Sequence, residues 1–119
     1  MRKLLISLIM VFGCSGAALA YVSGGHSYEL SCNAAGYVLT SENVVSRFVE
    51  GGAASRIWKK KEVIYMGRSC DAQHELFGSG KWCWANGGFV VEFDQMSFGF
   101  LRQELYCQAN DSLGIDCRC

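Results

Sequence analysis

The stretch from residue 81 to 93, KWCWANGGFVVEF, decides the fold class. Aromatic and β-branched residues dominate its two halves, KWCW and FVVEF, and such residues favour strands. Between the halves lies Asn86-Gly87-Gly88, a turn sequence, because Asn and Gly tolerate the positive φ angles of a tight hairpin. We therefore predict two antiparallel strands joined at this turn. A bulge inside one long strand is the alternative.

A third strand should follow, because the chain turns after residue 93 and the segment Gly99 to Cys107 can return beside it. We expect a register with Phe93 opposite Gly99 and Val91 opposite Leu101. In that register the odd-numbered side chains of both strands share one face.

Upstream, residues 27–32 and 36–40 alternate in the same way around the turn sequence NAAG, which predicts another β-hairpin. Tyr28 and Cys32 fall on one face of its first strand. The strand with Tyr28 and Cys32, followed by GYVLT at 36–40, resembles the opening of the small periplasmic β-barrel lysozyme inhibitors. The resemblance is confined to this hairpin, the later serine-glycine and tyrosine motif of that family is not visible here, and no site residue is carried over.

Residues 41–50, SENVVSRFVE, fit two structures. Their apolar residues recur at helical spacing, Ser41 could cap a helix, and Gly51-Gly52 could end it. The Val-Val and Phe-Val pairs are equally at home in a strand. We expect one short helix here, followed by a flexible loop over 51–55.

Three lysines, Lys59-Lys60-Lys61, precede a predicted strand from Glu62 to Gly67. Such a run is typical of a solvated edge or turn, and an anionic partner is the alternative. The polar, glycine-rich segment 68–80 predicts a loop.

These patterns predict an all-β fold: a small antiparallel sandwich or partly open barrel of about six strands, stapled by disulfides and carrying one short helix. No repeat and no proline divides the chain, so residues 21–119 should form a single domain.

Residues 1–20 have the pattern of a signal peptide. Arg2 and Lys3 give a positive start, an apolar run follows, and Ala18-Leu19-Ala20 is a small-residue cleavage site. The apolar segment falls short of the ~20 residues that span a bilayer. We expect cleavage before Tyr21 and export to the bacterial periplasm or the extracellular space, with no integral membrane segment in the mature protein.

Lipid modification of Cys14 is a weaker alternative, because Val11-Phe12-Gly13-Cys14 departs from the lipoprotein pattern at Phe12. Cleavage before Tyr21 removes Cys14 and lipid modification blocks it, so either outcome leaves six free cysteines. An even number of cysteines in a small exported chain predicts disulfides, and the six are Cys32, Cys70, Cys83, Cys107, Cys117 and Cys119. Their pairing stays open among 15 connectivities.

The charge balance of the chain bears on whether it can bind nucleic acid. Without Arg2 and Lys3, nine basic residues face eleven acidic ones, which gives a net charge of −2. We therefore expect no nucleic-acid partner, since such proteins need a basic surface.

Catalytic patterns are weak. A Cys70–His74 pair would need a free thiolate, which an oxidising compartment disfavours. The sequence contains no HExxH or CxxC metal motif. We expect no enzyme activity, no metal and no cofactor.

Trp82 and Trp84 are the best candidates for binding residues. They lie two apart on a strand, so they share one face while Cys83 points to the other. If Cys83 faces the core, both indoles form an exposed binding platform. If that face is covered, they belong to the core.

The function predicted from these features is an exported, non-catalytic binding module for a glycan or protein partner. The alternative is a secreted or periplasmic enzyme inhibitor that acts through a disulfide-held loop such as Arg68 to Lys81. An enzyme centred on Cys70 and His74 is the third class.

Overall fold

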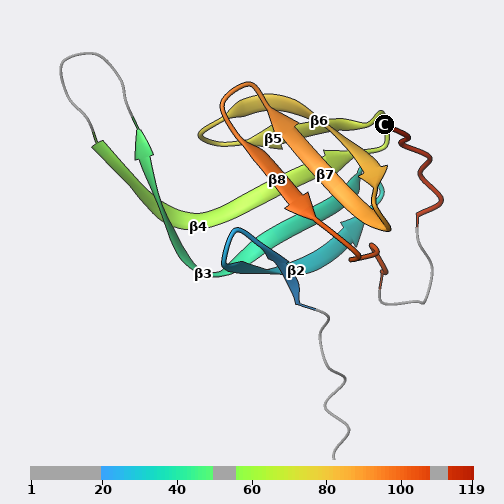
Figure 1. Cartoon of the computed structure of the whole chain (residues 1–119), viewed down its shortest axis with the longest axis horizontal. Helices are drawn as coiled ribbons and strands as arrows, with labels where there is room; N and C mark the ends of the chain where they lie inside the picture. Colours follow the sequence, from blue (N-terminus) through green and yellow to red (C-terminus); the bar gives the residue numbers. More distant parts are fainter. Residues whose placement is uncertain (1–19, 50–55, 108–112) are drawn as a thin grey trace, which may run out of the picture.

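A computed structural model describes residues 20–49, 56–107 and 113–119. Within these ranges the chain forms eight strands and no helix. In chain order the strands are β1 (Tyr21–Ser23), β2 (His26–Asn33), β3 (Gly36–Val49), β4 (Arg56–Gly67), β5 (Asp71–His74), β6 (Gly78–Ala85), β7 (Gly88–Phe93) and β8 (Ser97–Phe100). Each strand pairs antiparallel with its neighbours in sequence, so one sheet runs in order from β1 to β8 (Figure 1). The all-β prediction is confirmed, with eight strands rather than six.

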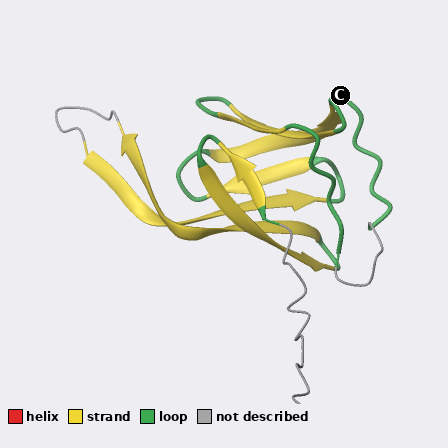
Figure 2. Ribbon diagram, turned by 60° about the horizontal axis from the view of Figure 1, so that its bottom comes forward, coloured by secondary structure: helices red, strands yellow, loops and turns green. Residues whose placement is uncertain are grey.

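The sheet curls until β1 lies against β8, which nearly closes a barrel (Figure 2). The side chain of Gln103, just after β8, completes this seam. Its Nε2 donates to the carbonyl of Val22 at 2.9 Å, and its Oε1 accepts from the Val22 N–H at 2.7 Å. A side-chain amide thus takes the place of a neighbouring strand and satisfies main-chain groups that an open edge would leave unpaired.

The two predicted hairpins are confirmed. β2 and β3 pair from Tyr28 opposite Ser41 to Asn33 opposite Gly36. β6 and β7 are joined by a two-residue turn whose members, Asn86 and Gly87, have φ angles of 54° and 69°. Positive φ at both central positions is what a tight hairpin needs, and it excludes the alternative of one long bulged strand.

The predicted register between β7 and β8 is wrong by three residues. Phe89 lies opposite Phe100 and Val91 opposite Phe98. The turn between the strands is short: the Phe93 N–H donates to the Met96 carbonyl at 2.8 Å, and β8 begins at Ser97. An odd shift exchanges the two faces of a strand. Phe98 and Phe100 therefore enter the core, and Leu101 is 59% exposed.

The expected helix over 41–50 is also wrong: residues 41–49 belong to β3. Past a register shift between Thr40 and Val44, each residue from Val44 to Val49 has a partner on β4, which begins at Arg56. Cross-strand pairing therefore overrides the helical spacing of the valines. The loop expected over 51–55 lies outside the described residues.

The β3–β4 pair continues well beyond its neighbours. β2 covers β3 only as far as Ser41, and β5 covers β4 only from Ile64 to Met66. Residues 44–49 and 56–61 form a two-stranded extension that leaves the barrel (Figure 1). We call this extension the arm.

The segment 68–80, predicted as a loop, instead contains β5 and the start of β6. Asp71 to His74 pair with residues 78–81, and residues 72–74 also pair with β4. Ala72 and His74 are buried. The burial of alternate residues is the strand signal that the polar composition of this segment conceals.

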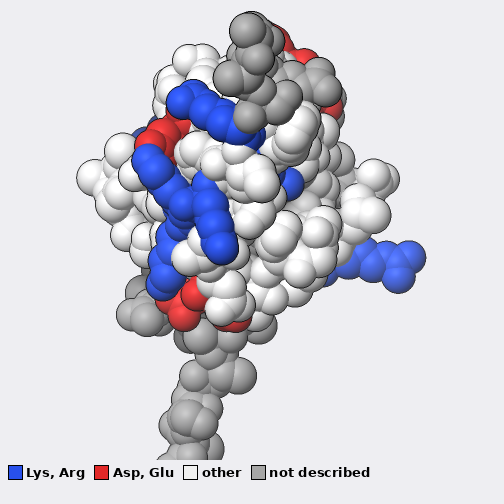
Figure 3. Space-filling view, turned by 90° about the vertical axis from the view of Figure 1, so that its left-hand side faces the viewer, with Lys and Arg blue, Asp and Glu red and all other residues white. Residues whose placement is uncertain are grey.

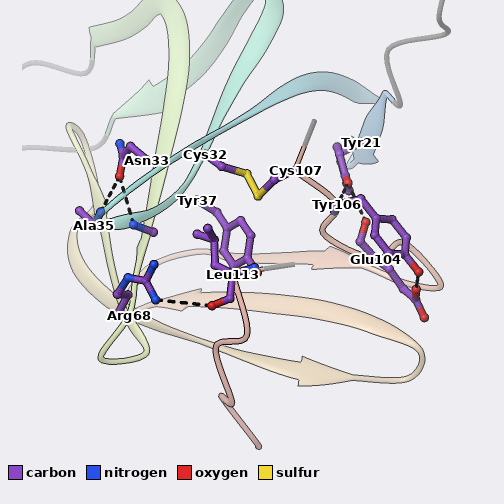
Figure 4. The surroundings of a disulfide bond; sticks show 11 residues. Tyr21, Cys32, Asn33, Ala35, Tyr37, Arg68, Glu104, Tyr106, Cys107 and Leu113 are labelled. Atoms are coloured by element: carbon purple, nitrogen blue, oxygen red, sulfur yellow. Dashed lines mark hydrogen bonds between the residues drawn. A yellow bond between two sulfur atoms is a disulfide. The ribbon is translucent and has the colours of Figure 1, made fainter. Parts of the chain in front are cut away.

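All six predicted cysteines are bridged, as Cys32–Cys107, Cys70–Cys117 and Cys83–Cys119. Two of these bridges tie the last residues to β6 and to the turn before β5. The tail is also held by Tyr37, whose hydroxyl accepts from the Leu113 N–H at 3.1 Å, close to the Cys32–Cys107 bridge (Figure 4). Three disulfides fit an oxidising, exported environment.

Candidate functional site

Trp82 and Trp84 lie on the same side of β6, as their spacing predicts, but this is the inner side. Trp82 is 1% exposed, and its Nε1–H donates to the Gly67 carbonyl at 2.9 Å. Trp84 is half-buried, and its Nε1–H donates to the Ile115 carbonyl at 3.0 Å. The two rings meet edge to face, with centroids 5.3 Å apart. Cys83 points outward to its bridge with Cys119. Trp82 therefore belongs to the core and is not part of an exposed platform, while Trp84 reaches the surface.

Trp84 lines a surface hollow of about 510 Å³ at the β6–β7 turn. A second hollow of about 440 Å³ adjoins it along the seam and shares Gly87, Glu104 and Tyr106 with the first. We call the two together the seam groove. Its lining comprises Tyr21, Trp84, Ala85, Asn86, Gly87, Gly88, Arg102, Gln103, Glu104, Tyr106 and also Ala20, which the expected cleavage before Tyr21 would remove.

Polar groups in the seam groove are positioned by one another. The Tyr106 hydroxyl donates to the Glu104 carboxylate, and this bond raises the pKa of Tyr106. The Tyr21 hydroxyl donates to the Glu104 carbonyl at 2.6 Å and accepts from the Tyr106 N–H at 3.2 Å (Figure 4). Burial raises the pKa of Tyr21. Cys107, the residue after Tyr106, is bridged to Cys32, which fixes this segment against the barrel.

A second cluster, centred on Glu62, lies inside the barrel where the arm begins. The Glu62 carboxylate accepts from Arg47 Nη2 at 2.9 Å and from Arg47 Nε at 3.0 Å. The Tyr28 hydroxyl also donates to it. His74 Nε2 lies 2.9 Å from the other carboxylate oxygen. Because His74 Nδ1 accepts from the N–H groups of Leu76 and Phe77, at 3.0 and 3.3 Å, the hydrogen of the neutral ring is on Nε2, which donates to Glu62.

Burial by itself would raise the pKa of Glu62, but the hydrogen bonds from His74, Arg47 and Tyr28 outweigh it and lower that pKa to about 2. Burial, together with the hydrogen bond to this carboxylate, raises the pKa of Tyr28. The side chains of Glu62 and His74 have no exposed surface. A substrate cannot touch them in this conformation, and we interpret the cluster as a structural one.

The sequence reasoning missed this cluster, although a signal was present. Glu62, Ile64 and Met66 alternate along β4, so parity places Glu62 on the same inward face as two core residues. An acid at an inward strand position needs buried donors.

The candidate catalytic pair is not assembled. Cys70 is bridged to Cys117, and the His74 ring contacts Glu62 instead. His26 starts β2, opposite Ser23.

Within the described ranges, no three His, Cys, Asp or Glu residues gather as a metal site would require. Nor do these ranges hold a helix of the length and apolarity needed to cross a membrane.

Comparison with models of known protein families, with curated proteins and with solved structures finds no match for this chain.

Proposed function

We propose that this protein is an exported, non-catalytic binding module and that the seam groove holds a glycan. The observation that carries the proposal is the pairing of two partly exposed aromatic rings, Trp84 and Tyr106, with a carboxylate, Glu104, in one hollow. Tyr106 is 49% exposed. Residues 1–20, the predicted signal peptide, would direct export of the module to the periplasm or the extracellular space and would then be removed.

The chemistry of the groove matches a sugar. Sugar rings present apolar C–H faces edged by hydroxyls, and the faces of Trp and Tyr rings supply large apolar area with a polar rim. Hydroxyls need donors and acceptors, which Glu104, Asn86 and Arg102 provide at the lining. The volume of each hollow falls within the ~300–1,000 Å³ typical of small-molecule sites.

Rigidity favours binding here. Trp84 is anchored through Ile115 and sits beside the bridged Cys83, and Tyr106 precedes the bridged Cys107. Groups that are already ordered in the free protein lose less entropy when a ligand arrives.

The test is a glycan array probed with the oxidised protein, followed by titration of the oligosaccharide that binds best. We expect Tyr106→Ala to weaken binding about 30-fold, the effect of losing an anchor worth ~2 kcal/mol. The matched control is Tyr65→Ala, a tyrosine of similar exposure, 52%, on β4. Failure of the array to show any ligand, or equal losses from both variants, would remove the proposal.

Enzyme inhibition is the second candidate. The segment Arg68 to Lys81 is a hairpin whose first turn is fixed by the Cys70–Cys117 bridge, which suits a rigid inhibitory element. This candidate gains support if the immobilised protein retains a hydrolase and lowers its activity. A retained hydrolase that keeps full activity argues against it.

A further inference from the structure

The arm carries a set of side chains that neither the barrel core nor the seam groove uses. Cross-strand partners lie on the same face of a sheet, so the pairs alternate between two faces. The inner face holds Arg47 and Trp58, which lie next to Glu62 and His74 respectively. The outer face holds three exposed pairs, Val44 with Lys61, Ser46 with Lys59, and Phe48 with Ile57.

Apolar surface is concentrated at the end of this outer face. Phe48 and Ile57 are opposite each other and are 66% and 67% exposed. Val44 is 52% exposed nearer the barrel. Two large apolar side chains presented together on a projecting element mark an interaction surface more often than single scattered ones do.

Positive charge accompanies the apolar pair. Residues 44–49 and 56–61 contain five basic residues and no acidic one. Arg47 is paired with Glu62, and Lys60 is paired with Glu75. Lys59 and Lys61 have no acidic partner among the described residues. Viewed from the end of the arm, Lys and Arg side chains gather along one side of the molecule, with a few acidic side chains between and beside them (Figure 3).

The spacing brings both kinds of side chain to one plane. Successive positions on a strand face are about 7 Å apart, so Lys59 follows the Phe48–Ile57 pair by one such step and Lys61 by two. A flat surface that contacts the apolar pair therefore lies within reach of both flexible ammonium groups. The arm extends away from the barrel (Figure 1), and the six side chains of its outer face are all exposed.

A second copy of the chain fits this face poorly. In a symmetric pair the lysines of both copies would approach one another, and like charges repel. The β4 edge of the arm, which carries Lys59, Lys60 and Lys61, is equally ill suited to pairing with another strand, because lysines along an edge oppose such pairing.

We propose that the outer face of the arm docks on an anionic lipid surface. Phe48 and Ile57 enter the boundary between headgroups and acyl chains, and Lys59 and Lys61 contact lipid phosphates. Aliphatic stems of lysine can lie along the apolar region while the ammonium group stays at the headgroups. This second binding surface is separate from the seam groove and does not depend on it.

The test is co-sedimentation of the full exported chain, with its disulfides oxidised, with vesicles of phosphatidylcholine. One set also contains phosphatidylglycerol, at about one third of the lipid, to supply negative charge. We expect binding to the anionic set alone, and loss of that binding as salt shortens the Debye length below ~10 Å.

Single variants separate the contributions. Lys59→Gln and Lys61→Gln should each weaken binding about fivefold, the equivalent of about 1 kcal/mol per lysine near an anionic surface. Phe48→Ser should weaken it about tenfold or more, because the lost apolar burial is that of a large side chain. The matched controls are Lys81→Gln and Leu101→Ser, exposed residues of the same chemistry outside the arm. Thermal melts confirm that each variant is folded.

Two results would overturn the proposal. The first is equal binding to neutral and anionic vesicles, or none to either. The second is a loss caused by the lysine variants and not by Phe48→Ser, with complete competition by soluble heparin. That second result assigns the arm to an acidic macromolecule in solution instead of a membrane.

Discussion

His74 Nε2 and Glu62 Oε2 lie 2.9 Å apart inside the barrel, and neither side chain has any exposed surface. They come from neighbouring strands, β5 and β4, whose pairing places His74 opposite Ile64. Arg47 on β3 and Tyr28 on β2 complete the set, so one carboxylate joins four consecutive strands. The cluster lies where the arm begins, at the point beyond which β3 and β4 pair only with each other. Because Arg47 belongs to the arm and Glu62, Tyr28 and His74 to the barrel, the cluster holds the base of the arm in place.

Removal of the Glu62 side chain should destabilise the protein strongly. Glu62→Ala leaves Arg47 as a largely buried charge without its partner, and such losses cost ~3–5 kcal/mol. Denaturant unfolding with the disulfides intact measures the change. The control is Glu75→Ala, which breaks the exposed Lys60–Glu75 pair and should cost at most ~1 kcal/mol. Equal effects of the two variants would show that the cluster contributes little.

Acid should weaken this contribution over a defined range. The pKa of Glu62 is about 2 in the folded protein against an ordinary 4.5. A carboxyl group whose pKa is lower in the folded state stabilises the fold above its unfolded pKa. That stabilisation is lost as pH falls from about 4.5 toward about 2. We expect the unfolding free energy of the wild type to fall more steeply across this range than that of Glu62→Gln, which cannot titrate there. Parallel slopes in urea melts at successive pH values would contradict the lowered pKa.

Much of the barrel was predictable because its signals are local. Asn86-Gly87 fixes a two-residue turn by its own backbone preferences, and the strands on either side follow from alternation. Register between β7 and β8 was not predictable in the same way. It depends on whether Phe98 and Phe100 or Leu101 fill the core, and that is decided by packing against Phe89 across the sheet.

The candidate sites, too, were predictable where local sequence decides them and not where packing between distant residues does. Parity correctly placed Trp82 and Trp84 on one face of β6, but parity does not say which face is inside. Bridge formation by Cys83 carried no such information either, because its partner Cys119 lies in a tail that runs outside the sheet. Tyr106 and Glu104 reach the seam groove only after the barrel closes, which depends on contacts between residues far apart in the chain.

Trp82 should be far more important for stability than Leu101, a large apolar residue on the surface. The Trp82 ring is buried against Tyr37 and Trp84, with its N–H bonded to Gly67. Trp82→Ala should lower the unfolding free energy by ~3–5 kcal/mol, and Leu101→Ala by at most ~0.5 kcal/mol. Guanidinium melts of the oxidised proteins compare them. A Trp82→Ala protein as stable as Leu101→Ala would mean that the inner face of β6 is open.

The three disulfides should contribute in the order of the chain lengths that they close. Cys32 and Cys107 are 75 residues apart, and Cys83 and Cys119 are 36 apart. Restriction of the unfolded chain then stabilises the fold by about 4.5 kcal/mol for the longer loop and about 3.8 kcal/mol for the shorter one. Paired Cys→Ala variants, each lacking one bridge, should therefore melt well below the wild type, the Cys32–Cys107 pair lowest. Full reduction should lower the midpoint by more than ~10 °C, because even ~2 kcal/mol shifts a small domain that far. An unchanged midpoint after reduction, with free thiols confirmed by titration, would show that the strand pairing and core hold the barrel without these bridges.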